Sequence, residues 1–253
     1  MRPCTMTKPL VLALLIAFSG AGLAAADGFR DIASVNAITY FDGSWRIETS
    51  DAFLARIVPG FTVLARVARN DEEGWNQYVF TVGPVVNFSD TLYLDAAYGL
   101  GIDSLGALMH EVGANFNYET DATSTSLGVR ADFFPDSGYF YFLPSLSGKF
   151  HPLPALGVFG KLFLSIDSAA IVTEAFWGEA DYAFSPVFRA RAGFTVSRAS
   201  TLGYSLIGGI DVSFTPSLTL KYSLQYLSDS IEYLTAPQLH SGVSNLLLLD
   251  WRF

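Results

Sequence analysis

The chain has 253 residues, with 24 acidic and 15 basic side chains and a formal net charge of −9 at pH 7. This acidic balance argues against nucleic acid as a partner. Half of the residues are hydrophobic, 15% are aromatic, and Cys4 is the only cysteine. An internal disulfide framework and a thiolate metal site are therefore excluded.

The N-terminal residues are typical of an export signal. A short basic start precedes an apolar run from Pro9 to Leu23, and Ala24-Ala25-Ala26 supplies small residues for cleavage. We expect residues 1–26 to be removed, which leaves 27–253 as a single domain with 13 basic and 24 acidic residues. A membrane-spanning helix is the competing interpretation, but the run is short and no basic residues follow it to stop transfer.

The rest of the chain is hydrophobic but lacks an apolar run of the roughly 20 residues that a spanning helix needs. An exported chain of this kind has one other way to cross a bilayer, as a closed β-barrel. Strict alternation supports this fold: SLTLKYSLQYL places leucines and tyrosines on one face and Thr, Lys, Ser and Gln on the other. VFRARAGFTVS and TSLGVRADF alternate in the same way. A soluble β-sandwich also alternates, but its solvated face would hold more charge.

An aromatic residue followed by turn-forming residues recurs along the chain. The rings are Phe88, Tyr118, Phe150, Phe184 and Phe214, separated by 30, 32, 34 and 30 residues. Every interval is even, so all five rings are predicted to point outward at one membrane interface. An interval of about 31 residues fits one hairpin, because a strand of about 12 residues tilted by about 40° rises about 30 Å.

The turns predict an up-and-down antiparallel transmembrane β-barrel of about 14 strands, with 12 as the main alternative. On the side of the aromatic turns, Val58-Pro59-Gly60 fits the first connection and His151-Pro152 a later one. The last connection, Ser228 to Ser241, is much longer and is predicted to be an exposed loop, with a lid or partial plug as the alternative. The opposite turns are predicted at 42–44, 70–74, 103–106, 135–138, 167–169 and 199–201.

The C-terminal strand carries Leu247, Leu249, Trp251 and Phe253 on one face. It resembles the closing strand of bacterial outer-membrane proteins, whose alternating apolar residues and final aromatic residue form a signal for the barrel-assembly machinery. The mature length resembles a small single-barrel outer-membrane protein, and its short turns and Trp-basic-Phe ending are similar to the YaiO-type barrel family. The resemblance implies location in the cell outer membrane, with outer-membrane lipids, lipopolysaccharide and the assembly machinery as partners. It transfers no functional site, and the oligomeric state stays open.

Most charges inside the strands fall on the face opposite the aromatic residues, so they are predicted to line the lumen. They either border a water-filled path or pair off and stiffen the wall. Because 14 strands lie between a filled 8-stranded barrel and an open 16-stranded one, we predict a passive channel for small hydrophilic solutes or ions. A closed structural or surface-interaction barrel is the alternative. The candidate lumen-lining residues are Arg46, Glu48, Arg66, Asp95, Glu111, Arg130, Asp132, Lys161, Arg189, Arg191, Asp211 and Lys221.

Acidic residues also gather in the turns opposite the aromatic ones. This rim is predicted to face the cell exterior, where it would bridge divalent cations to lipopolysaccharide, favour cation entry or simply keep the loops soluble. An enzyme that acts on lipids is the least favoured function: it would need His240 with Ser241 or Ser244, and no catalytic motif, metal site or cofactor site is predicted. The rim comprises Asp42, Asp71, Glu72, Glu73, Asp103, Asp136, Asp167, Asp229 and Glu232.

Overall fold

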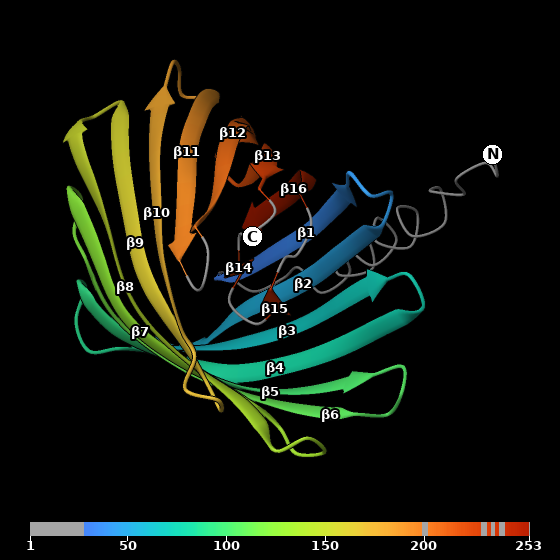
Figure 1. Ribbon diagram of the computed structural model, residues 1–253. Coiled ribbons are helices and arrows are strands. Elements are labelled where there is room, and N and C mark those ends of the chain that lie inside the picture. Colours follow the sequence, from blue (N-terminus) through green and yellow to red (C-terminus); the bar gives the residue numbers. More distant parts are fainter. Residues whose placement is uncertain (1–27, 199–201, 229–231, 234–235, 238–240, 253) are drawn as a thin grey trace.

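A computed structural model describes residues 28–198, 202–228, 232–233, 236–237 and 241–252. Fourteen antiparallel strands of the described chain form a closed barrel (Figure 1). Neighbouring strands follow one another in sequence, and the last long strand pairs with both the previous one and the first. The fourteen-strand prediction is therefore confirmed over the twelve-strand alternative. The strands are β1 Phe29–Tyr40, β2 Trp45–Val58, β3 Phe61–Glu72, β4 Trp75–Asn87, β5 Leu92–Asp103, β6 Leu108–Glu119, β7 Thr123–Phe134, β8 Tyr139–Leu153, β9 Leu156–Asp167, β10 Val172–Ala183, β11 Phe188–Arg198, β12 Leu202–Thr215, β13 Leu218–Leu227 and β16 Gly242–Arg252.

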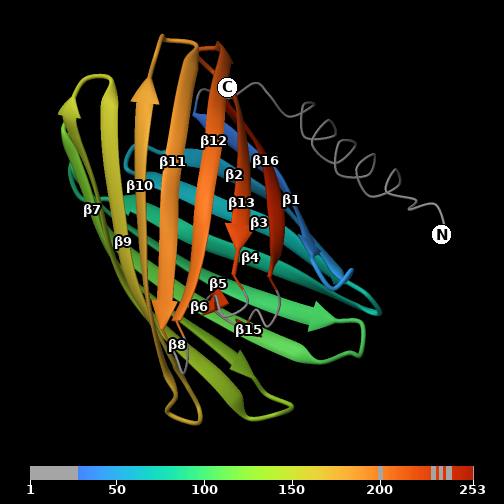
Figure 2. The same cartoon turned by 45° about the horizontal axis from the view of Figure 1, so that its top comes forward.

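Pairing of β1 with β16 closes the wall in an unbroken register, from Arg30 opposite Arg252 to Tyr40 opposite Gly242. The end at which β1 begins and β16 ends is called the terminal end below, and the opposite one the loop end. Figure 2 shows the tilt of the strands in the wall. The long last connection, at the loop end, contains a short hairpin of β14 Glu232–Tyr233 and β15 Ala236–Pro237, which alternation did not predict.

The two faces of the wall differ as a barrel in lipid requires. Large apolar side chains are exposed on the outer face along most of the strands. The five periodic rings, Phe88, Tyr118, Phe150, Phe184 and Phe214, are 47–64% exposed and flank the turns at the terminal end. The prediction that the even spacing points them all outward is confirmed.

Two predicted turn boundaries are wrong. His151-Pro152 was expected in a turn, but β8 continues to Leu153 through a register shift after Phe150, and the connection falls at residues 154–155. The loop expected at 70–74 is only Glu73-Gly74, where the positive φ of Gly74 permits a tight hairpin. At 70–72 polar residues continue the ladder, because strand pairing uses backbone groups that nearly every residue carries. At 151–152 a bulge carries the strand past the proline.

Two prolines interrupt the ladder in the middle of the wall. Pairing of β4 with β5 stops around Pro84, and pairing of β8 with β9 stops around Pro144, because proline has no N–H to donate. Beside Pro84, a Cβ on Gly83 would overlap the backbone of Ala96, so the strands meet closely there. Among the described residues, no helix is long and apolar enough to cross a membrane.

Candidate functional site

The candidate site is the inner face of the barrel wall. All twelve predicted lumen-lining residues share the face that lies opposite the exposed apolar side chains, by the register of their strands. Alternation along the strands predicts the face on which each side chain lies. The structure adds which of these charged side chains contact each other. Two of the ion pairs, Arg66–Glu111 and Lys149–Asp181, join strands that are not neighbours in the wall.

The first network joins β3, β6 and β7. Arg66 Nη2 lies 3.3 Å from Glu111 Oε1, and the other oxygen of Glu111 lies 3.0 Å from Arg130 Nη2. Arg130 also holds Asp132 through two hydrogen bonds of 2.7 and 2.8 Å, and Asp132 is completely buried. Arg66 reaches β6 by passing over Gly99 of β5, where a Cβ would lie 3.1 Å from Glu111 Cβ.

The second network joins β8, β10 and β11. Lys149 Nζ and Arg189 Nη1 each lie 2.7 Å from an oxygen of Asp181, whose side chain is 5% exposed. Gly157 of β9 lies beneath the Lys149–Asp181 pair, and a Cβ there would overlap both partners. Lys149 and Asp181 are not among the twelve candidate lumen-lining residues, although the alternation of their strands indicates the inner face.

A third contact set surrounds Arg191 on β11. Its Nε lies 2.9 Å from Asp211 Oδ1, an ion pair without hydrogen-bond geometry, and its Nη2 donates to Ser223 Oγ at 2.7 Å. To reach β13, Arg191 passes over Gly209, where a Cβ would lie 3.1 Å from its Nη2. Glu179 lies 3.8 Å from Arg191 Nη1.

The same arrangement recurs in all three sets: an inward-facing glycine lies between the wall and a long charged side chain. Gly99, Gly157 and Gly209 leave room for the side chains to lie along the wall rather than project into the lumen. The guanidinium-bearing side chains of Arg66, Arg130 and Arg189 nevertheless remain 35–39% exposed. Since they are on the inner face, water-sized space adjoins them there.

The remaining predicted residues divide into paired and unpaired groups. Near the loop end, Arg46 contacts Glu72 and lies 3.7 Å from Glu48. Asp95 accepts hydrogen bonds from the amides of two asparagines of β6, at 2.6 and 2.8 Å. In the part of the chain that the structure describes, Lys161 and Lys221 have no ion-pair partner.

One further ion pair lies at the closure seam. Arg30 of β1 donates to both carboxylate oxygens of Asp250 of β16, at 2.8 and 2.7 Å. The sequence signal for it was weak, because 220 residues separate the two side chains. On the outer face of β16 lie Leu247, Leu249 and Trp251, as the assembly-signal pattern predicts, whereas Phe253 lies outside the described residues.

Several carboxylates of the acidic rim cap turns. Asp167 Oδ1 accepts the backbone N–H groups of Ala169 and Ile171, and its Oδ2 accepts the Tyr139 hydroxyl at 2.6 Å. Asp103 caps its turn in the same way: it accepts two backbone N–H groups of the turn and the indole N–H of Trp75. The described residues contain no group of three or more acidic, histidine or cysteine side chains placed to hold a metal ion. Asp229 lies outside the described residues, and Glu232 forms part of β14.

An acidic pair lies on the outer face, where sequence analysis singled out nothing. Asp31 of β1 and Asp51 of β2 are 6% and 7% exposed, and they are diagonal neighbours on adjacent strands. One oxygen of each carboxylate is buried without a hydrogen-bond partner within the described chain. Two carboxylates among outward-facing side chains are costly in a bilayer, where few donors are available.

The structure gives no contact between His240 and the two serines considered as its catalytic partners, because His240 lies outside the described residues. Ser241 stands just before β16. His110 is on the outer face of β6, where its Nδ1 lies 2.7 Å from the hydroxyl of the outward-facing Tyr98.

Comparison with known proteins defines the class of protein by fold. No protein-family profile matches the chain, and no curated protein matches it. Among solved structures it is similar to the P. putida toluene transporter TodX, with a TM-score of 0.64, 9% identity, and coverage of 90% of this chain and 91% of that one. A bacterial polysaccharide outer membrane secretin matches with a TM-score of 0.60, 12% identity, and coverage of 90% and 98%. The CymD monoaromatic hydrocarbon channel matches with a TM-score of 0.60, 10% identity, and coverage of 93% and 92%.

The protein therefore has the fold of a bacterial outer-membrane β-barrel. Identities of 9–12% establish the fold alone. The finer resemblance to the YaiO-type family stays a prediction, as does the cleaved signal, which lies outside the described residues.

Proposed function

We propose that the protein is a passive channel in the bacterial outer membrane for small hydrophilic solutes or ions. The observation that carries this proposal is the exposure of Arg66, Arg130 and Arg189, which keep 35–39% of their side-chain surface although they are on the inner face. A charged side chain inside a dry, filled barrel would be buried together with its partner. Solvent-accessible charge on the inner face therefore supports a water-filled lumen.

The wall chemistry favours hydrophilic solutes. The inner face carries arginines, carboxylates, serines and amides along most strands, so an apolar solute would find few surfaces to contact. Similar barrels include a protein described as a hydrocarbon channel and another described as a toluene transporter, which supports transport as a role for this fold. The charged inner face is why we assign a different class of solute here.

We place the terminal end in the periplasm and the acidic rim at the cell surface. The connections at the terminal end are short, and the longest connection, residues 228–241, is at the loop end, which is the usual arrangement in outer-membrane barrels. Outer-membrane lipids and lipopolysaccharide would then contact the exposed apolar band. The barrel-assembly machinery would recognise the last strand, β16.

Planar-bilayer recording with the purified barrel tests the channel. We expect stepwise conductance in potassium chloride, with an ion selectivity that shifts toward cations in Arg130→Gln because a lumen cation is lost. Arg198→Gln is the matched control: Arg198 is on the outer face of β11, so its loss should leave selectivity unchanged. Absence of conductance steps at every voltage would refute the channel.

A closed structural barrel is the second candidate, and the pairing of charges favours it. The networks around Glu111 and Asp181 tie together strands that are not neighbours, which stiffens the wall. This candidate predicts an intact, lipid-embedded barrel that passes neither ions nor sugars. An enzymatic role has less support, because the similar structures are mostly channels and porins.

A further inference from the structure

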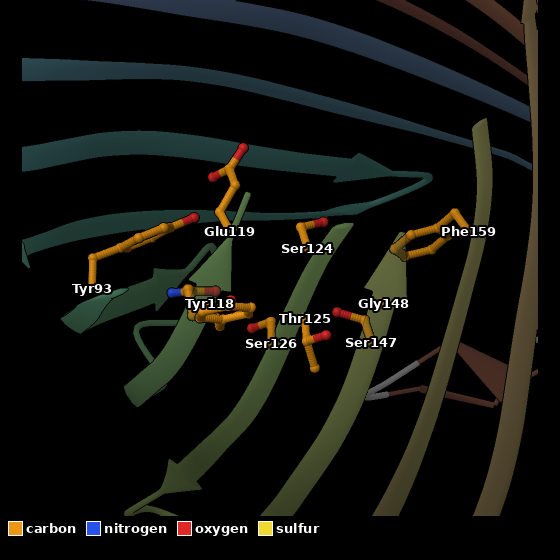
Figure 3. Close-up of a pocket in the computed structure, with 10 residues that line it drawn as sticks. Tyr93, Tyr118, Glu119, Ser124, Thr125, Ser126, Ser147, Gly148 and Phe159 are labelled. Atoms are coloured by element: carbon orange, nitrogen blue, oxygen red, sulfur yellow. The ribbon is translucent and has the colours of Figure 1, made fainter. Parts of the chain in front are cut away.

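A cavity of about 250 Å³ lies on the inner face near the terminal end, at the wall formed by β5 to β9 (Figure 3). Two aromatic rings stand on either side of it, Tyr93 from β5 and Phe159 from β9. Between them lie the serine hydroxyls of β7 and β8. The cavity therefore combines two apolar ring surfaces with a polar floor.

The hydroxyls of the floor are free. Ser124, Ser126 and Ser147 have no hydrogen-bond partner among the residues that the structure describes. Several inward hydroxyls elsewhere are engaged, as in the 2.8 Å contact of Ser34 with Ser50. Since hydroxyls that face a cavity without a protein partner must bond to water or to a ligand, this floor is available for recognition.

The charge around the cavity favours a neutral ligand over an anion. Glu119 borders it beside Tyr93. No lysine or arginine of the described chain lines the cavity. Lys149, opposite Ser124 in the wall, binds Asp181 at 2.7 Å, and Lys161, opposite Ser147, is not a lining residue. Among the lining residues a ligand would meet one carboxylate and no cation.

We propose that this cavity binds a neutral sugar ring or a similar polyhydroxylated ring as it passes through the lumen. The C–H faces of the ring would lie against Tyr93 and Phe159, and its hydroxyls would bond to the three serines and to Glu119. The inference deepens the proposed channel function and rests on it, because it names the class of solute. A sugar ring has about twelve non-hydrogen atoms. With the binding free energy per atom that is usual for small ligands, it would bind with a Kd on the order of 1 mM, which is weak enough to allow release.

Equilibrium binding to the barrel in detergent tests the cavity without requiring conductance. The Trp177 ring lies 5.1 Å from the Phe159 ring, so a sugar against Phe159 should alter tryptophan emission. We expect maltose, one ring of which would occupy the cavity, to change emission with a Kd on the order of 1 mM, and Trp177→Phe to abolish the change. Glucuronate should bind at least about fivefold more weakly, because its carboxylate meets Glu119.

Variants then separate the cavity from the rest of the lumen. The double variant Ser126→Ala and Ser147→Ala should weaken maltose binding about tenfold, since two hydrogen-bonding groups are lost. Ser50→Ala, an inward serine outside the cavity, should leave binding unchanged. Equal binding by the double variant and the native chain would overturn the assignment, and so would no response to maltose at about 50 times the expected Kd.

Conductance recorded in parallel keeps the two proposals distinguishable. Conductance with no maltose binding would overturn the cavity assignment and leave the channel standing. Maltose binding without conductance would support the cavity and overturn the channel. Reversible maltose block of the current, lost in the double serine variant, would support both.

Discussion

Gly157 gives the sharpest test of how the inner wall is organised. Replacing it with alanine would place a Cβ where Lys149 and Asp181 now cross β9, within 2.7 Å of Lys149 Cε and overlapping a carboxylate oxygen. The Lys149–Asp181 bond should therefore break. A hydrogen bond between charged groups contributes about 1.5–3 kcal/mol, and the lower part of that range applies because Lys149 is 28% exposed. Alanine regains about 0.5–1 kcal/mol by restricting the unfolded chain, so the net loss should be about 1 kcal/mol.

A double-mutant cycle shows whether this loss acts through the ion pair. Asp181→Ala alone should cost about 3 kcal/mol, because it leaves Lys149 and Arg189 without their shared partner. In that background Gly157→Ala should cost nothing, which gives a coupling of at least about 1 kcal/mol. The assay is urea unfolding in lipid vesicles, followed by tryptophan emission.

The matched control is Gly208→Ala, since nothing lies within 4 Å of the Cβ it would add. It should leave stability unchanged or raise it slightly. If the Gly157 and Asp181 changes add within about 0.5 kcal/mol, the two sites do not interact and the reasoning is wrong.

Three further changes test other parts of the wall. Gly83→Ala should destabilise the barrel by about 3 kcal/mol or more in the same urea assay, because the new Cβ overlaps the backbone of β5. Asp51→Asn should stabilise it by about 1–2 kcal/mol, because an amide can donate to the carboxylate of Asp31. Tyr139→Phe should speed amide exchange in the turn after Asp167 by about tenfold, because the capping carboxylate loses its side-chain donor.

Each of these has an outcome that contradicts it. A Gly83→Ala barrel as stable as the native one would mean that β4 and β5 separate easily beside Pro84. A loss of stability in Asp51→Asn would mean that the outward acid pair has a partner on that face. Unchanged exchange in Tyr139→Phe would show that the backbone bonds to Asp167 alone hold the turn.

The sequence by itself determined the fold, because strand alternation and turn spacing are local. A period of two fixes which face each side chain takes, and the even spacing from Phe88 to Phe214 fixes that the rings share a face. The turns then predict about 14 strands, and the closed barrel of the structure decides against the alternative of 12. Boundaries failed where the chain offered no local stop: His151-Pro152 lies inside β8, since a bulge can carry a strand past a proline.

Only the tertiary structure decided which charges meet. Arg66 and Glu111 are 45 residues apart and come from strands separated by two others, so their contact depends on closure and on the tilt of the strands. The glycines beneath these pairs look like ordinary strand residues in the sequence. The cavity between Tyr93 and Phe159 likewise exists only where five strands curve around one space, because its lining residues come from β5, β6, β7, β8 and β9.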